Sequence, residues 1–244
     1  DLTHTDLSGA NLAGANLAGA NLTGANLRQS NFTGMVLTDV KLSGVDLTGS
    51  NLAGADLTEV NLTGATLINV DLSGANLSGA NLTDVSLSGA NLCNVSVIGA
   101  DLTGADLTGA SLTGADVTRV NLMGATLSDT DLAGANLTGA VLSDRDLRSV
   151  KLTAANLADS DLRSVNLTGV DLCGVNLTGT NLTDSNLAGA NLTDANLSGA
   201  DLTHTDLSGA NFTDTDLAGA NFMGAYLMGA DVAHTDLSDT NLTD

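Results

Sequence analysis

A leucine recurs at every fifth residue, and this period constrains the fold more than any other feature of the sequence. The series runs from Leu2 to Leu242 without insertion and has 49 centres, of which 43 are Leu, three are Phe and three are Val. No Leu lies outside it. We number the places of each pentad so that in Asn21-Leu22-Thr23-Gly24-Ala25 the centre is the second place.

The other places of the pentad are almost as restricted. All 28 Gly occupy the fourth place, and the first place is Asn or Asp in 39 of 49 pentads. The fifth place is Ala, Val, Ser or Thr in 46 of 48, and the third is Thr or Ser in 31 of 49. Gly and Asx at fixed places are typical of a regularly repeated turn.

A period of five fits neither a helix nor an extended strand. On an α-helix, successive centres would step by about 140° and scatter around the axis. On a strand, they would alternate between the two faces. The chain must therefore turn once per pentad, which predicts a coil of short straight sides and regular corners.

The runs Ala-Asn-Leu-Ala-Gly, Ala-Asn-Leu-Thr-Gly and Ala-Asp-Leu-Thr-Gly resemble the pentapeptide-repeat family, and the resemblance covers the whole chain. It implies an all-β fold, a right-handed quadrilateral β-helix (β-solenoid) with four pentads per coil. The second and fifth places would point inward and the other three outward. It implies no single function, because members of the family do unrelated things.

Four pentads per coil predict about twelve coils in a single solenoid domain over residues 1–244. At a strand spacing of about 4.8 Å, the stack would be ~58 Å long. The chain begins at Asp1 and ends within a pentad, so we expect a segment of a longer array or head-to-tail self-association through uncapped coil edges. The predicted core comprises the centres, among them Leu2, Leu7, Leu12, Leu17, Phe32, Val97, Val117, Phe212, Phe222 and Val232.

The chain is strongly acidic, with 28 Asp and Glu against 7 Lys and Arg and a net charge of −21. The acids occupy only outward places: 17 Asp take the first place, and ten Asp and Glu59 take the fourth. This charge excludes an ordinary basic surface for direct nucleic-acid binding. No apolar stretch is long enough for a membrane span or a signal peptide, which favours a cytoplasmic protein without a membrane partner.

Basic residues are concentrated in one part of the sequence. Five of the seven form a candidate partner-contact zone, with local charge balance as the simpler interpretation: Arg119, Arg145, Arg148, Lys151 and Arg163. Arg145 occupies a fifth place, where an unpaired charge would be costly. We expect a local bulge there, or a side chain that reaches out to solvent.

His and Cys residues offer no catalytic or metal site. The phrase His-Thr-Asp recurs at His4, His204 and His234, without a nucleophile or second ligand at fixed spacing. Residues 1–11 and 201–211 are identical, which suggests segmental duplication or deliberate construction. Cys93 and Cys173 lie four coils apart in the expected stack, about 19 Å, too far for a disulfide. Free exposed thiols favour a reducing compartment.

The sequence therefore predicts no enzyme, cofactor or metal. Its Gly residues are single and periodic, unlike a phosphate-binding loop, and the pentads leave no long loop to form a substrate pocket. The leading hypothesis is a non-catalytic structural or protein-interaction rod. The alternative is an acidic DNA mimic that binds a topoisomerase such as DNA gyrase, or another DNA-binding enzyme, as the quinolone-resistance members of the family do. This sequence shows neither the projecting loops nor the C-terminal dimerisation helix of those members.

Overall fold

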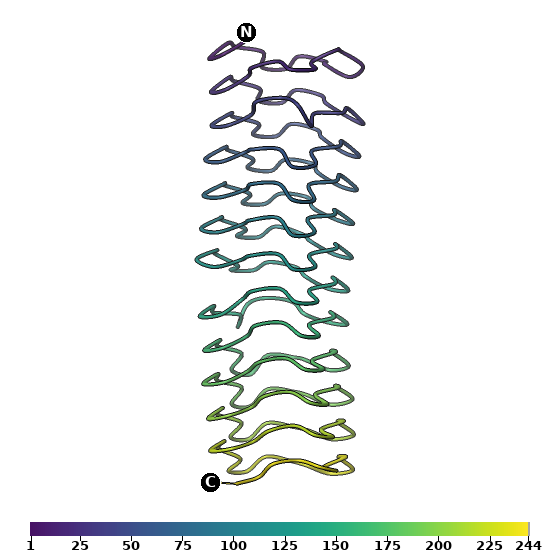
Figure 1. The fold of residues 1–244 in the computed structure, drawn as a ribbon, viewed down its shortest axis with the longest axis vertical. Helices are drawn as coiled ribbons and strands as arrows, with labels where there is room; N and C mark the ends of the chain where they lie inside the picture. Colours follow the sequence, from purple (N-terminus) through teal and green to yellow (C-terminus); the bar gives the residue numbers. More distant parts are fainter. Residues whose placement is uncertain (244) are drawn as a thin grey trace. The chain divides into compact units, whose positions relative to one another are not determined.

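The computed structural model describes residues 1–243, and the chain divides into two compact units, Asp1–Asp131 and Leu132–Asp244. Within each unit the chain winds into coils stacked on one another (Figure 1). Along residues 1–243 the backbone contains isolated parallel bridges and turns, and neither a helix nor an extended strand is formed. No helix of this part of the chain is long and apolar enough to cross a membrane.

Parallel bridges join residues 20 positions apart, so four pentads make one coil. Asn31 pairs with Asn51 in the first unit, and Asn156 pairs with Asn176 in the second. Two backbone hydrogen bonds flank each such pair: beside Asn21 and Lys41, the Leu22 N–H donates to the Lys41 carbonyl at 2.9 Å and the Lys41 N–H donates to the Ala20 carbonyl at 3.0 Å. Each unit is thus a β-helix whose coils are joined by main-chain hydrogen bonds, and the expected all-β fold is confirmed.

Each pentad closes a tight turn, which explains the glycines. The Ala25 N–H donates to the Leu22 carbonyl at 2.8 Å, and Gly24 between them has a φ of +65°. A positive φ at the third residue of a four-residue turn is typical of a type II turn and favours Gly or Asn. All 28 Gly and 18 other fourth-place residues have positive φ. Among the described fourth places, only Asp39 and Ser149 do not.

The core lies along the second and fifth places, as expected. Phe32, Val97 and Val117 are buried, and Phe212 and Phe222 meet edge to face with ring centroids 6.5 Å apart. Because these two centres are ten residues apart, half a coil, their rings meet across the interior. Burying apolar side chains of this size contributes about 1.5–3 kcal/mol each.

Centres in the first and last coils of the described chain are less covered. Leu2, Leu7, Leu12 and Leu17 are half-buried. Val232 departs from the expected core position, because 45 % of its surface is exposed. A centre is buried only when a coil lies on each side of it, and residues 1–243 place a coil on just one side of Val232.

Candidate interaction surface

The outward side chains are ordered by a repeated hydrogen-bond pattern. The first-place Asx oxygen accepts the third-place N–H, as Asn21 Oδ1 does from Thr23 at 3.2 Å, and the Thr23 hydroxyl donates to the same oxygen at 2.7 Å. Such Asx turns satisfy backbone groups that the ladder leaves free. A regular polar surface with fixed side-chain positions follows.

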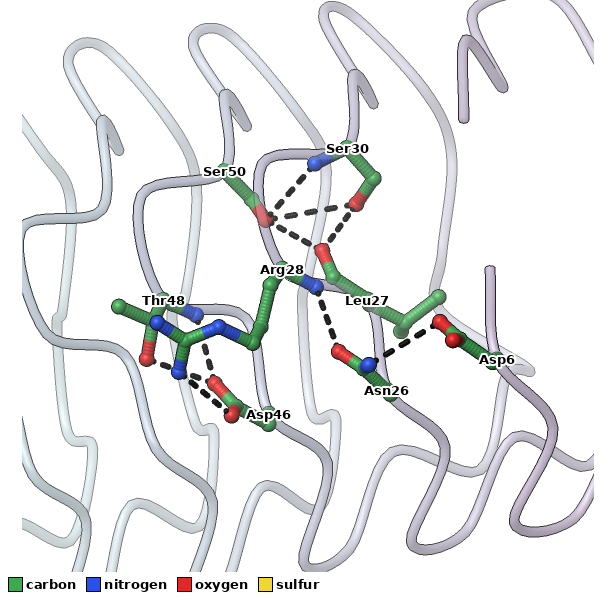
Figure 2. Close-up of polar contacts among 8 residues, drawn as sticks. All are labelled: Asp6, Asn26, Leu27, Arg28, Ser30, Asp46, Thr48 and Ser50. Atoms are coloured by element: carbon green, nitrogen blue, oxygen red, sulfur yellow. Dashed lines mark hydrogen bonds and ion pairs between the residues drawn. The ribbon is translucent and has the colours of Figure 1, made fainter. Parts of the chain in front are cut away.

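First-place amides also join neighbouring coils. Asn26 Nδ2 donates to Asp6 Oδ1 at 3.0 Å, and Arg28 Nη1 contacts Asp46 Oδ2 at 3.0 Å (Figure 2). In the same view, the buried Ser50 hydroxyl donates to the Leu27 carbonyl at 2.6 Å. Neighbouring coils are therefore joined by polar side chains on the surface and in the core, in addition to the main-chain hydrogen bonds.

These hydrogen bonds shift the acidity of several carboxyl groups. The Ser8 and Ser208 hydroxyls, followed by the N–H groups of the same residues, lower the pKa of Asp6 and Asp206. At Asp236 the N–H of Ser238 contributes most to the lowered pKa, ahead of its hydroxyl. Each of these groups is stabilised as the carboxylate, because its donors favour the charged form.

Arginine neighbours act in the same direction on three further acids. The guanidinium groups of Arg148 and Arg163 lower the pKa of Asp146 and Asp161, respectively. At Asp46, burial works to raise the pKa, and hydrogen bonds from Thr48 and Arg28 outweigh it and lower the pKa. The carboxylates are therefore held in place by charge-assisted contacts.

The five basic residues of the expected contact zone are divided between the two units, and the zone stays a prediction. Arg119 lies in the first unit and the other four lie in the second. Arg148 and Arg163 are exposed, and each pairs with the Asp two residues before it at 2.6 Å. Residues 20 positions apart lie on the same side of the coil, so the pentad of Arg163 stacks on the pentad that begins at Val141. Lys151 belongs to a pentad two sides further along the same coil. The ion pairs of Arg148 with Asp146 and of Arg163 with Asp161 match the interpretation that the basic residues balance local negative charge.

Arg145 causes no bulge, because the turns and bridges of the repeat continue around it. The Asn166 N–H donates to the Arg145 carbonyl at 2.9 Å, as the repeat requires. The side chain is half-buried, and its Nε donates to the Ser143 carbonyl at 3.1 Å. The Arg145 side chain is therefore neither fully buried nor without a partner.

The histidines and cysteines lie apart from any cluster of metal ligands. His204 and His234 are exposed and face Asp184 and Asp214 of the preceding coil, at 3.4 and 3.7 Å. Within the described chain, no group of three His, Cys, Asp or Glu could hold a metal ion. Cys93 Sγ lies 3.3 Å from Ser111 Oγ, and both Cys93 and Cys173 are free thiols.

A cleft of about 410 Å³ opens between the first two coils, and our reading of the sequence missed it. Its lining includes Met35, a fifth-place residue that is 6 % exposed. The signal was present, since Met35 and Arg145 are the two exceptions to the small fifth place. By contrast, the interior space lined by centres from Leu72 to Leu112 measures about 10 Å³, too small for a ligand.

Comparison with known proteins agrees with the repeat. The profile of the family described as "Pentapeptide repeats" matches in eight copies, over residues 1–34, 36–74, 71–109, 105–144, 146–179, 174–209 and 205–244. Among curated proteins, none matches the chain.

Three solved structures illustrate the likeness. HetL from the cyanobacterium Nostoc sp. strain PCC 7120, a pentapeptide repeat protein involved in heterocyst differentiation regulation, is 30 % identical, with 98 % of this chain and 90 % of HetL covered and a TM-score of 0.29. QnrB1, a plasmid-mediated fluoroquinolone resistance protein, is 20 % identical over 88 % of this chain and 89 % of its own, with a TM-score of 0.43.

Rfr23, a pentapeptide repeat protein from the cyanobacterium Cyanothece 51142, is 25 % identical over 59 % of this chain and 91 % of its own, with a TM-score of 0.16. Likeness at these TM-scores says nothing about what this chain binds. The family profile, however, covers nearly every residue, and the 20-residue coil, the turn at each pentad and the buried centres are those that the repeat requires. The chain belongs to the pentapeptide-repeat family.

Proposed function

We propose that the protein is a non-catalytic scaffold that binds other proteins through its outward side chains. The observation that carries this proposal is the fixed polar exterior, in which Asx turns and amide contacts such as Asn26 to Asp6 hold side chains at 20-residue intervals. Such a surface presents a regular array without requiring a loop to become ordered on binding, which reduces the entropic cost of association.

The proposed architecture is a right-handed quadrilateral stack of about twelve coils within one domain of residues 1–244. Its support is the sequence, where the pentad period passes through residues 131 and 132 without insertion. The exposed thiol of Cys173 favours a reducing compartment and hence the cytoplasm.

A photo-crosslinking series tests the scaffold. One third-place residue on each side of the coil would be replaced singly by a photoreactive amino acid: Thr63, Thr48, Ser73 and Thr58. In extract of the source cells, we expect the same partner to be captured from one or two adjacent sides. Equal capture from all four sides, or none above a label-only control, would contradict a specific docking face.

Acidic DNA mimicry is the second candidate, favoured by the distribution of charge. Asp and Glu occur on all four sides of the coil, always at outward places, and exceed Lys and Arg by 21. An extended negative potential attracts proteins that bind DNA. In a DNA gyrase supercoiling assay, mimicry predicts inhibition or drug protection at micromolar protein.

The control for mimicry is a variant in which exposed first-place Asp residues are changed to Asn. This change removes charge and retains the Asx-turn oxygen, so the coil should fold as before. Loss of inhibition in this variant would support mimicry. No effect of the parent protein on gyrase would leave the scaffold as the proposal.

A further inference from the structure

The backbone ladder is interrupted between residues 14–19 and 33–38. The regular ladder bonds are present on either side of this interruption. Before it, the Leu12 N–H donates to the Asn31 carbonyl at 2.9 Å, and after it the Lys41 N–H donates to the Ala20 carbonyl at 3.0 Å. Between them, four N–H groups that the repeat would pair across the coils make no such bond in the described chain: those of Gly14, Leu17, Gly19 and Val36. Their usual acceptors are the carbonyls of Thr33, Val36, Thr38 and Ala15.

The sequence explains why the ladder opens here. Met35 places a long side chain in the slot that otherwise holds a small residue, and it is almost fully buried. Val36 follows at a first place and has no side-chain oxygen to accept the N–H of Thr38. Asp39 lacks the positive φ of the regular turn. One oversized side chain and two altered turn residues thus separate the coils along one side.

The resulting cleft has the chemistry of two unpaired strand edges. It measures about 410 Å³, and its lining includes Gly14, Ala15, Ala18, Gly34, Met35 and Asp39. Four of these residues are Gly or Ala, so an incoming chain can approach the backbone closely. Each edge presents both kinds of backbone group, with most of the unpaired N–H groups on residues 14–19 and most of the unpaired carbonyls on residues 33–38. Such edges favour a ligand that offers donors and acceptors together, which an extended polypeptide does.

Charge indicates which polypeptide would be favoured. Asp39 lies in the lining, Asp56 pairs with Val36 on the following coil, and Glu59 occupies the same fourth-place column as Asp39. Three carboxylates therefore lie on this side of the first unit, with Lys41 as the nearest cation in sequence. Complementarity favours cationic side chains on the incoming strand.

We propose that the cleft between residues 14–19 and 33–40 binds an extended basic peptide, which pairs with both open edges as an inserted strand. The proposal names a partner class and so rests on the interaction function proposed above. Its test involves only the cleft, so failure here would leave a docking face elsewhere on the coils intact.

The test uses an acetylated, amidated heptapeptide of alternating lysine and valine. One control peptide carries N-methyl groups on its valines, which keeps the charge and removes the backbone donors of those valines. A second control replaces lysine by glutamate. Titration calorimetry and amide hydrogen exchange at Leu17, Gly19 and Val36 would be measured for the protein and for Met35→Ala, which restores the usual small residue. Val70→Ala, at a fifth place where the ladder is intact toward both neighbouring coils, is the matched control.

We expect the lysine–valine peptide to bind and to slow exchange at the three amides. N-methylation and Met35→Ala should each weaken binding by about tenfold or more, since they remove the hydrogen bonds or close the cleft. Val70→Ala should leave binding unchanged. Three results would overturn the proposal: slow exchange at these amides in the free protein, equal binding of the N-methylated peptide, or no binding at about 1 mM peptide.

Discussion

The fourth place of the pentad makes the strictest demand on a single residue. Its backbone must adopt positive φ, which Gly reaches without strain and which costs other residues about 1–2 kcal/mol. Space is a second demand at some positions. A Cβ on Gly179 would lie 2.6 Å from Asp159 Oδ1, whereas one on Gly174 would meet no atom within 4 Å. Side chains at this place therefore extend over the glycine of the next coil.

Alanine substitutions separate these two demands. Gly174→Ala should lower the free energy of unfolding by about 1 kcal/mol through φ alone. Gly179→Ala should cost more, because the Asp159 carboxylate must also move. In an Asp159→Gly background, the extra cost should disappear, which urea unfolding would show. Equal costs for the two single variants would mean that Asp159 relaxes freely.

The lowered pKa of Asp206 gives a second test at a single residue. Removing the hydroxyl with Ser208→Ala should raise this pKa, because that hydroxyl is the largest cause of the shift. A group whose pKa is lowered by folding stabilises the fold above its unfolded pKa, near 4, and that contribution is lost as pH falls through the folded value. Ser208→Ala should therefore weaken the fold at neutral pH more than in acid.

Carbon-13 NMR titration of the Asp206 carboxyl and urea unfolding across the acidic range would measure both effects. Ser198→Ala is the control, since its first-place partner is Asn196, which does not titrate. The same pH dependence in both variants would show that the Ser208 hydroxyl does not act through the Asp206 carboxylate.

The coil joins its neighbours through buried hydroxyls as well as through the ladder. Fifth-place Ser and Thr donate to the carbonyl of a centre in the preceding coil, as Ser185 Oγ does to Leu162 at 2.7 Å and Thr180 Oγ1 to Leu157 at 2.9 Å. Ser160 is equally buried, and its Oγ has no hydrogen-bond partner among the described residues. The same residue type thus occupies the same slot with and without a bond.

Ser160→Ala and Ser185→Ala should have opposite effects. Removing the unpaired Ser160 hydroxyl should raise the free energy of unfolding by about 1 kcal/mol, because a buried polar group without a partner is costly. Removing the paired Ser185 hydroxyl should lower it by a similar ~1 kcal/mol. Chemical unfolding of both variants is the measurement, and destabilisation by Ser160→Ala would contradict the assignment of an unpaired hydroxyl.

The period of the sequence was enough to predict a coil that turns once per pentad, because each centre must return to one core, a requirement that single residues do not alter. The inward places and the all-β fold came from the resemblance to the pentapeptide-repeat family. The cleft at Met35 was not predicted, since a pentad count treats a long apolar residue at the fifth place as a tolerated exception. The Arg pairs were not predicted either, because side-chain geometry decides whether Arg148 reaches Asp146.

Across the whole chain, acidic side chains are arranged so that neighbouring coils seldom place two together. Of the 17 first-place Asp residues, only Asp216 and Asp236 are 20 positions apart, and they form one of the parallel bridges. In the other cases, the residue 20 positions after a first-place Asp is neutral or basic. Asn191, for example, follows Asp171 by one coil, and its side-chain amide donates to the Asp171 carboxylate at 2.8 Å. With the fourth-place pairs Asp39–Glu59 and Asp194–Asp214, only three pairs of acids have the 20-residue spacing in a chain with a charge of −21.

Placing an Asp between two others tests whether this spacing matters. Asn181 is bridged to Asp161 on one side and Asp201 on the other, whereas Asn176 is bridged to Asn156 and Asn196. Asn181→Asp should therefore cost about 0.5–1 kcal/mol more than Asn176→Asp in urea unfolding. The difference should vanish in about 1 M NaCl, where screening acts within ~3 Å. Asn176→Asp also loses a 2.8 Å amide bond to Asn156, so the control is biased against the prediction. A difference that survives high salt would show that the cost does not come from repulsion between the carboxylates, and the spacing of the acids would then have no electrostatic role in folding.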